Sequence, residues 1–308
     1  MSAVTVAGVA LTHPDRVLYP RLGLTKLDLA RYLEAVSPRM LPHVLGRPVA
    51  LLRCPRGTGQ PCFYQRHWTV TGAAGVAAVP ITEADGSREP CPVVQGEKGL
   101  ISLAQHGVVE VHPWGARADR IEMPDRMVFD LDPGPGVSWA RVRSAAFAVR
   151  DALRELGLSS WAMTSGGKGL HVALPLQRRN NWAVVADFAE GVARALGRQF
   201  PKEFILRARK AERKGRIYLD WLRNSRGATS VAPWSVRARS GAPVAMPVGW
   251  KELESIDGGD AFDIWEAFGR ATGRAADPWA GFWPARQQIT ERARRALAST
   301  DSGAPASG

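Results

Sequence analysis

The sequence predicts an α+β fold in which the main sheet keeps one face open. Three observations lead to this prediction. The 308 residues are 45% hydrophobic, which is enough for one large or two modest globular domains. Between residues 126 and 222, short apolar runs alternate with two long amphipathic stretches, as strands alternate with helices. The strands are few and their loops carry the polar residues, which favours a sheet that is open on one side.

The first 115 residues are expected to form an N-terminal α/β module. Residues 1–11 alternate weakly between apolar and polar positions, as in a short strand. Thr25 is a good N-cap for a helix that we expect to end at Ser37-Pro38, because the residue before a proline disfavours the α conformation. Further strand pieces are expected at residues 49–52, 63–64, 100–103 and 108–111.

Residues 116–250 are expected to form the second module. Its strands are expected at residues 127–131, 161–164, 170–176 and 217–222, and its helices at 138–156 and 181–195. After Trp250 the chain is mostly helical, so residues 251–298 are expected to form a helical cap packed on this module. Residues 299–308 are a polar tail rich in Gly, Ser and Pro, which we expect to be disordered.

The net charge of +12 comes from 41 basic and 29 acidic residues. Such an excess favours a polyanionic partner, most commonly nucleic acid, although a high-GC genome that enriches arginine would produce it too. Eleven basic and three acidic residues lie between Lys202 and Arg239. A buried strand interrupts this basic run, which suggests the wall of an anion-binding groove.

The cysteines are Cys54, Cys62 and Cys91. Their odd number and the lack of a close paired spacing argue against a disulfide framework and against a zinc site. The chain has neither the pattern of a signal peptide nor an apolar stretch of about 18 residues. We therefore expect a cytoplasmic protein.

Three aspartates follow predicted buried strands. Asp130 and Asp132 share a face of their strand because side chains alternate with period 2, and Asp220 ends another strand. Carboxylates on one face repel one another unless protons or cations intervene, and Mg²⁺ and Mn²⁺ prefer oxygen ligands. If the strands are neighbours, the three groups can hold two such ions about 3.5–4 Å apart, an arrangement that serves nucleotidyl transfer. Alternatively, Asp220 pairs with a nearby arginine.

A glycine-rich loop at residues 165–171 joins two of the predicted strands. Glycines let backbone N–H groups wrap an anion, while Lys168 offers a charge and Ser165 a hydrogen bond to a phosphate. His171 begins the next strand and could contact the same group. The loop is not a Walker A motif, because Gly follows the lysine. A glycine-rich hairpin explains the glycines, but it does not explain Ser, Lys and His together.

Other residues are candidates for contacts with anions or bases. Arg16 and Lys26 flank the start of a helix, where the dipole favours an anion. Phe63 and Tyr64, followed by cationic residues, suit stacking on bases, although core packing is the simpler explanation. The remaining candidates are Arg237 and Asn224, which could be ordinary surface residues, and His112, which could be a hydrogen-bonded structural histidine.

Three segments in order, residues 129–134, 165–171 and 217–237, closely resemble the polymerase domain of bacterial ligase D, a member of the archaeo-eukaryotic primase superfamily. Residues 12–20 and 247–253 resemble the same family, so the resemblance covers roughly residues 10–295. It implies a primase-polymerase fold. It also implies a template-directed nucleotidyltransferase that prefers ribonucleotides and fills gaps or joins ends in non-homologous end joining.

The resemblance also implies a role for each candidate residue. Asp130, Asp132 and Asp220 match the ligands of two Mn²⁺ or Mg²⁺ ions. The matches to nucleotide contacts are Ser165, Lys168, His171, Arg237, His112 and Asn224, with His171 also counted as catalytic. The matches to DNA contacts are Arg16 and Lys26, for a downstream 5′-phosphate, and Phe63 and Tyr64, for stacking.

This chain departs from the family at two of these positions. Arg16 stands where a lysine is commoner, and Tyr64 stands where the family has a second phenylalanine, and both changes preserve the contact. The implied partners are DNA with a gap or an end that bears a 5′-phosphate, NTP or dNTP, and possibly Ku and a DNA ligase, at the nucleoid. The chain shows neither a Lys-x-Asp-Gly ligase motif nor a nuclease segment.

Three alternative functions share some of these features. A stand-alone relative could fill gaps in excision repair. The Asp-x-Asp pair also begins haloacid-dehalogenase-like phosphatases, with Asp130 as nucleophile and Asp132 as acid and base, but Asp220 and the basic run would then have no role. A nucleic-acid-binding module without catalysis would have no reason to keep three clustered acids.

Overall fold

The structure is a computed structural model, and it describes residues 4–83 and 86–302. The chain divides into two compact units that do not follow the expected module boundaries. Unit 1 takes the chain up to Asp119 together with residues 229–246 and 260–277. Unit 2 takes residues 120–228, 247–259 and the chain from Pro278 onward. The segment 229–246 was expected in the second module, but it joins the N-terminal part.

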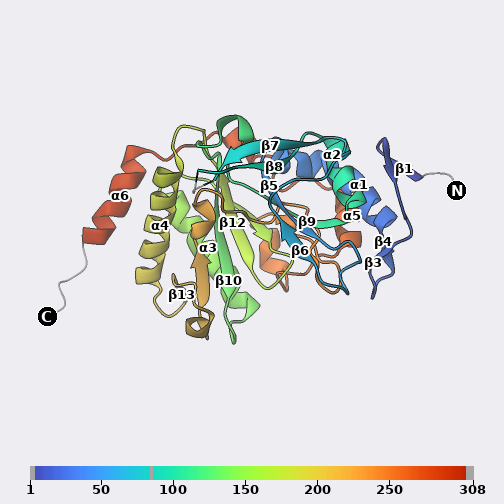
Figure 1. The fold of residues 1–308 in the computed structure, drawn as a ribbon. Coiled ribbons are helices and arrows are strands. Elements are labelled where there is room, and N and C mark those ends of the chain that lie inside the picture. Colours follow the sequence, from blue (N-terminus) through green and yellow to red (C-terminus); the bar gives the residue numbers. More distant parts are fainter. Residues whose placement is uncertain (1–3, 84–85, 303–308) are drawn as a thin grey trace. The chain divides into compact units, whose positions relative to one another are not determined.

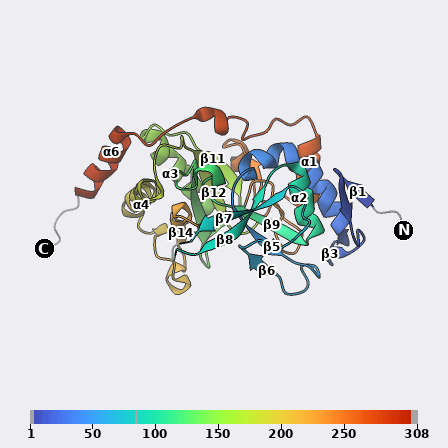
Figure 2. The same ribbon diagram turned by 45° about the horizontal axis from the view of Figure 1, so that its top comes forward.

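Unit 1 is built from small antiparallel sheets and the helices α1, α2 and α5 (Figures 1 and 2). The strand order of its three-stranded sheet is β6-β5-β9, and β1-β2, β3-β4 and β7-β8 form two-stranded sheets. Its elements are β1 (Val4–Val6), β2 (Val9–Leu11), β3 (Val17–Tyr19), β4 (Leu24–Thr25), α1 (Lys26–Val44), β5 (Val49–Arg53), β6 (Phe63–Gln65), β7 (Val76–Thr82), β8 (Arg88–Val94), α2 (Glu97–Gln105), β9 (Val108–Pro113) and α5 (Ile264–Thr272).

Helix α1 begins where it was expected to begin and ends later. The Thr25 side chain accepts a hydrogen bond from the N–H of Asp28, and the Asp28 carboxylate accepts one from the N–H of Thr25, which completes a capping box. The helix does not end at Ser37 but continues through Pro38 and Pro42. Apolar residues one turn apart beyond the first proline are fully buried, so packing outweighs the lost backbone hydrogen bond.

Residues 100–103 were expected to form a strand, and this prediction is wrong. They lie inside helix α2, whose buried side begins at Gly99 and includes Leu100 and Leu103. A short apolar run fits a buried strand and a buried helix equally well, so its periodicity does not distinguish them.

The cysteine prediction is also wrong, because Cys54 and Cys62 form a disulfide bond. Strands β5 and β6 are antiparallel, and Arg53 lies opposite Phe63 in their register. Cys54 follows Arg53 and Cys62 precedes Phe63, so the two cysteines begin and end the loop between the strands. Their Cα atoms are 4.5 Å apart. The strand pairing therefore creates a disulfide that residue spacing alone did not indicate.

Unit 2 contains a six-stranded sheet of order β13-β14-β10-β12-β11-β15. Strand β10 pairs with β14 and β12 in antiparallel fashion, and helices α3 and α4 pack on it (Figure 1). The elements are β10 (Arg126–Pro133), α3 (Trp139–Glu155), β11 (Trp161–Thr164), β12 (Leu170–Pro175), α4 (Trp182–Gln199), β13 (Phe204–Ile205), β14 (Ile217–Asp220), β15 (Pro247–Val248) and α6 (Glu291–Ser302). The α+β class is confirmed, and so are the strands and helices expected between residues 126 and 222.

The expected C-terminal cap is divided between the units. Helix α5 belongs to unit 1, where it packs against α1, whereas α6 packs against α4 in unit 2. Of the expected tail, residues 299–302 are helical, and residues 303–308 lie outside the described part of the chain. No helix among the described residues is long and apolar enough to cross a membrane.

Candidate active site

The core of the candidate site is a row of polar side chains across three strands of the unit 2 sheet. Asp130 on β10 lies directly opposite Asp220 on β14 and directly opposite His171 on β12. Because residues that are directly opposite share a sheet face, all three side chains project to the same side. Sequence reasoning expected Asp220 to meet Asp130 if their strands were neighbours, and they are.

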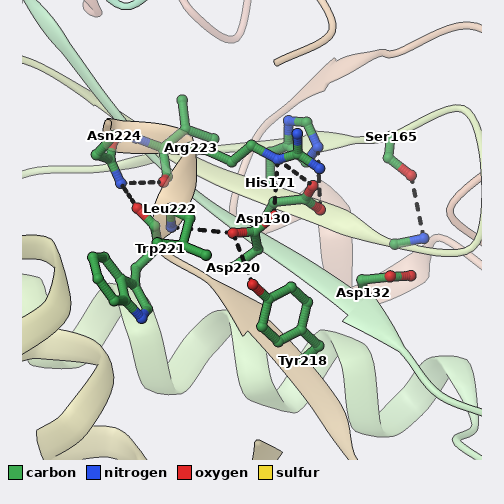
Figure 3. Close-up of polar contacts among 12 residues, drawn as sticks. Asp130, Asp132, Ser165, His171, Tyr218, Asp220, Trp221, Leu222, Arg223 and Asn224 are labelled. Carbon is green, nitrogen blue, oxygen red and sulfur yellow. Dashed lines mark hydrogen bonds and ion pairs between the residues drawn. The ribbon is translucent and has the colours of Figure 1, made fainter. Parts of the chain in front are cut away.

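Arg223 lies between the two carboxylates (Figure 3). Its Nε atom is 3.3 Å from Asp130 Oδ2 and 3.0 Å from Asp220 Oδ2. On the other side of Asp130, the Oδ1 atom is 3.4 Å from His171 Nε2. Asp220 also accepts hydrogen bonds from the hydroxyl of Tyr218 and the N–H of Leu222 through Oδ1. Asp130 therefore faces the His171 imidazole and the Arg223 guanidinium, and Asp220 shares the guanidinium.

The two carboxylates differ in their acidity. Burial opposes the ionisation of Asp130, but His171 and Arg223 outweigh it and lower the pKa to about 2. Burial raises the pKa of Asp220, Arg223 lowers it, and the neighbouring charge of Asp130 raises it again, with a net upward shift. Asp130 is thus a stable anion, and it makes a second negative charge beside it costly.

Asp132 is separated from this pair. It lies opposite Tyr218, one alternation further along the same face, and its side chain is 52% exposed. Its Oδ2 atom accepts a hydrogen bond of 2.5 Å from Nη1 of Arg213, whose guanidinium also lies over the Tyr218 ring. Among the described residues, the carboxylates of the three aspartates do not all lie within 4.8 Å of one another. The structure therefore brings two of the three expected acids together.

The donors at this site fit a divalent cation. Asp130 and Asp220 are adjacent oxygen donors on neighbouring strands, and their two charges face one shared arginine. Burial is the main cause of the raised Asp220 pKa, and the neighbouring charge of Asp130 adds to it. A hard cation relieves this repulsion, and carboxylate oxygens are the ligands that Mg²⁺ and Mn²⁺ prefer.

The glycine-rich loop joins β11 and β12, as expected. Ser165 closes it, because its backbone N–H donates to the carbonyl of Gly169 and its hydroxyl accepts from the N–H of Gly169. A Cβ at Gly169 would lie 2.4 Å from the carbonyl oxygen of Leu131, so only glycine fits beside β10. Lys168 is exposed, and no ion pair of its ammonium group is found within the described residues. The loop thus holds a lysine ready to contact a ligand.

Asn224 is buried and serves the strand. Its amide accepts a hydrogen bond of 2.8 Å from the N–H of Val128 and donates one of 2.8 Å to the carbonyl of the same residue. It also donates to the carbonyl of Trp221. The side chain therefore continues the pairing of β10 beyond the end of β14, and it anchors the turn that carries Arg223.

In unit 1, the Glu110 side chain contacts His112 and Arg237, two residues that were expected to bind the nucleotide. Its Oε2 atom lies 2.9 Å from His112 Nε2 and 2.9 Å from Arg237 Nε, and its Oε1 accepts a 2.7 Å bond from the N–H of Ala238. Burial opposes the ionisation of Glu110, but the contacts with His112, Arg237 and Ala238 outweigh it and lower the pKa to about 2. His112 and Arg237 are thereby held in one cluster.

The expected stacking pair lies at the exposed edge of the unit 1 sheet. Phe63 and Tyr64 on β6 are 49% and 59% exposed. The guanidinium of Arg53 lies over the Phe63 ring, and the Tyr64 ring packs edge-on against His112 with 5.5 Å between centroids. These aromatic side chains are therefore exposed on the surface and are not part of the core.

The two cations expected to hold a 5′-phosphate differ in exposure. Arg16 is exposed and donates to the carbonyl of Pro55. Lys26 is buried, and its ammonium donates to the carbonyls of Thr12 and Gln105. Burial, and then the charge of Arg16, lowers the pKa of Lys26. Both residues lie where helix α1 begins, since the N–H of Lys26 donates to the carbonyl of Arg16.

Sequence reasoning missed four residues that shape these sites. Glu110 and His112 are two residues apart on β9, so their side chains share a face of the strand. This alternation could have identified Glu110 as a neighbour of His112. The other three are Arg213, Tyr218 and Arg223, which lie in the basic run of residues 202–239. Their sequence positions did not indicate which carboxylate each one faces.

Comparisons with known proteins agree with the resemblance seen in the motifs. The family model of the LigD primase-polymerase domain matches residues 25–279. The chain is 37% identical over 297 residues to the multifunctional non-homologous end joining protein LigD of Pseudomonas aeruginosa, covering 96% of this chain and 35% of that protein. It is 34% identical over 262 residues to the corresponding protein of Mycobacterium tuberculosis, covering 82% of this chain and 34% of that protein.

A solved structure shows the same fold. The polymerase domain of Mycobacterium tuberculosis ligase D, in complex with DNA, matches with a TM-score of 0.83 and 33% identity. The match covers 89% of this chain and 97% of that one. The chain spans about a third of the length of the curated relatives named above. These findings do not favour the phosphatase, the excision-repair or the non-catalytic alternative.

Proposed function

This chain belongs to the LigD primase-polymerase family, and we propose that it adds nucleotides to DNA ends under the direction of a template during non-homologous end joining. Polymerase domains of this family are metal-dependent nucleotidyltransferases. The observation that carries the proposal is the directly opposed pair of Asp130 and Asp220 on adjacent strands. Adjacent carboxylates of this kind can hold the divalent cations that assist phosphoryl transfer.

We assign Asp130, Asp132 and Asp220 as the ligands of two Mg²⁺ or Mn²⁺ ions. When bound, such ions activate the attacking hydroxyl and neutralise the triphosphate. The residues around the acids suit this assignment. Arg223 and Arg213 already form ion pairs with these carboxylates. Their positive charges reduce the repulsion between the carboxylates when no metal ion is bound. His171 keeps Asp130 ionised, since its ring faces Oδ1 of that carboxylate.

We assign the loop of residues 165–169 to the phosphates of the incoming nucleotide. Lys168 is exposed and contributes the charge, while Ser165 keeps the loop closed through Gly169. His171 stands next to Asp130 at the start of β12. Arg237 and His112 are assigned to nucleotide binding, with ribonucleotides preferred, on the resemblance of their segments to the family. Asn224 then acts on the nucleotide only through the position of its turn.

We assign DNA contacts to unit 1. Phe63 and Tyr64 offer exposed ring faces to bases, and Arg16 offers its guanidinium to a downstream 5′-phosphate. Lys26 contributes to that phosphate site from its buried position at the start of α1. The solved relative is a complex with DNA, which supports DNA as the partner. We also propose Ku and a DNA ligase as protein partners and the nucleoid as the place where the protein acts.

Extension of a labelled primer across a short gap tests this function. The substrates carry or lack a downstream 5′-phosphate, and the reactions contain Mn²⁺, Mg²⁺ or chelator, with NTP or dNTP. We expect templated addition that requires metal and is stronger with the phosphate and with NTP. Absence of incorporation under every metal condition, with DNA still bound, would contradict the assignment of a polymerase. Equal extension with and without the phosphate would contradict the role of Arg16 and Lys26.

A further inference from the structure

The β7-β8 hairpin of unit 1 gathers metal-binding side chains that the proposed polymerase does not use. In its register, Cys91 lies opposite Val79 and Glu89 lies opposite Ile81. The N–H of Glu83 donates to the carbonyl of Ser87, which continues the pairing by one alternation. Because opposed residues and every second residue share a face, Glu83, Glu89 and Cys91 lie on one face of the hairpin.

His67 reaches this face from a different segment. It follows β6, and the N–H of Trp68 donates to the carbonyl of Pro90, which holds this segment beside β8. One donor atom from each of His67, Glu83 and Cys91 lies within 4.8 Å of the others. The Oε2 atom of Glu89 is 3.8 Å from Nδ1 of His67. Three separate stretches of the chain thus place sulfur, nitrogen and oxygen donors together.

Within the described part of the chain, two of these donors, the Cys91 thiol and the His67 Nδ1 atom, are not used in other bonds. Cys91 is the free thiol of this chain, since Cys54 and Cys62 are joined, and it is buried. The Nδ1 atom of His67 is buried and has no hydrogen-bond partner among the described residues. Buried polar atoms normally have a partner, so an unused nitrogen that faces a thiol and carboxylates calls for an explanation.

We propose that this cluster, His67, Glu83 and Cys91 with Glu89 beside them, binds a zinc ion. A mixed set of thiolate, imidazole and carboxylate donors suits Zn²⁺, whereas Mg²⁺ and Mn²⁺ avoid sulfur. On binding, the thiol proton of Cys91 passes to solvent and the thiolate forms a bond to the metal. The ion then ties the hairpin to the segment that follows Phe63 and Tyr64. This role is structural and does not depend on polymerase activity.

Titration with Co²⁺ as a spectroscopic probe tests the site, because a thiolate bound to Co²⁺ gives a charge-transfer band that oxygen ligands do not give. The purified protein is kept free of reductant so that the disulfide stays closed. We expect the band to saturate at one equivalent and to disappear when Zn²⁺ is added. We also expect Cys91→Ser to abolish it, and His67→Gln to weaken Co²⁺ binding by roughly tenfold or more.

Two control variants separate this site from other cation sites. His13→Asn removes an exposed histidine elsewhere in unit 1, at a position whose φ of 51° asparagine tolerates. A Cys54→Ser/Cys62→Ser double variant removes the other cysteine sulfurs. Both should keep the band. The proposal is overturned if the unaltered protein shows no thiolate band, if Co²⁺ binds only with the weak spectrum of oxygen ligands, or if the band survives in Cys91→Ser.

Discussion

Two acidic clusters, one in each unit, contain the same chemical groups in different proportions. In unit 1 the single carboxylate of Glu110 faces His112, Arg237 and the N–H of Ala238. In unit 2 the two carboxylates of Asp130 and Asp220 share Arg223, and His171 adds a contact to Asp130 alone. The carboxylates are largely buried in both clusters, and the clusters differ in how many acids share one arginine.

The pKa shifts follow this difference. Cationic and hydrogen-bond partners lower the pKa of Glu110 to about 2 despite its burial. Burial and the neighbouring charge of Asp130 raise the pKa of Asp220 even though it pairs with Arg223. A carboxylate that is fully compensated stabilises its surroundings, whereas one that is only partly compensated has charge left to attract a cation. Charge balance therefore distinguishes the Glu110 cluster from the candidate metal site at Asp130 and Asp220.

The largest effect is expected from changing the unit 2 acids. Asp130→Ala or Asp220→Ala should lower nucleotide incorporation by roughly a hundredfold or more, because each removes a proposed cation ligand. DNA binding should stay within about twofold, since the proposed DNA contacts lie in unit 1. Primer extension measures the first quantity, and fluorescence anisotropy of labelled DNA measures the second.

A matched control for these variants is Asp151→Ala. Asp151 lies on α3 of the same unit, and within the described residues its ion-pair partners are Arg150 and Arg154. It should retain incorporation. If Asp130→Ala or Asp220→Ala retained incorporation as well, the assignment of these carboxylates as metal ligands would be wrong.

The next effect concerns stability and its dependence on pH. The pKa of Glu110 is about 2 in the folded protein, below its ordinary value of 4.5, so the stability it contributes is present above about pH 4.5 and is lost as pH falls toward 2. Glu110→Gln should therefore lower the free energy of unfolding by up to about 3 kcal/mol at pH 7. Urea unfolding of unaltered and variant protein from pH 2.5 to 7 measures this difference, which should shrink at the acid end.

Asp220→Asn is the comparison for this measurement, because its sign is opposite. The pKa of Asp220 is raised on folding, so its ionisation above that pKa costs stability. At pH 7 the amide should leave the free energy of unfolding unchanged or slightly higher. Equal destabilisation by Glu110→Gln and Asp220→Asn would show that the two clusters do not differ in charge balance.

The smallest effect is expected from the shared arginine. Arg223→Gln removes the charge that competes with a cation for Asp130 and Asp220, so Mn²⁺ should bind roughly threefold to tenfold more tightly. Electron paramagnetic resonance of free Mn²⁺ during titration measures the affinity. Arg226→Gln is the control, because Arg226 pairs with Glu122 in the same unit. Weaker Mn²⁺ binding to the Arg223 variant would mean that the arginine helps to hold the cation.

Strands β10, β11, β12 and β14, helices α3 and α4, and the main polar positions of unit 2 could be predicted from the sequence. Strand β10 reads as an apolar run ending in Asp130 and Asp132, and period 2 alone places both on one face. The glycine-rich loop was likewise predicted between two apolar runs, which form β11 and β12. Such features depend on residues a few positions apart, and local chain geometry determines them.

Contacts between distant segments could not be predicted in this way. Glu110 meets Arg237 across 127 residues, and Arg213 meets Asp132 across 81. The disulfide between Cys54 and Cys62 and the gathering of His67 with Glu83 and Cys91 likewise depend on strand pairing.

The helix that continues past Pro38 shows that packing can also override a local signal. The sequence by itself determined which strands end in acids and which loops carry glycine. Only the tertiary structure decided which cation each acid faces, because that choice depends on which strands lie side by side and how deeply they are buried.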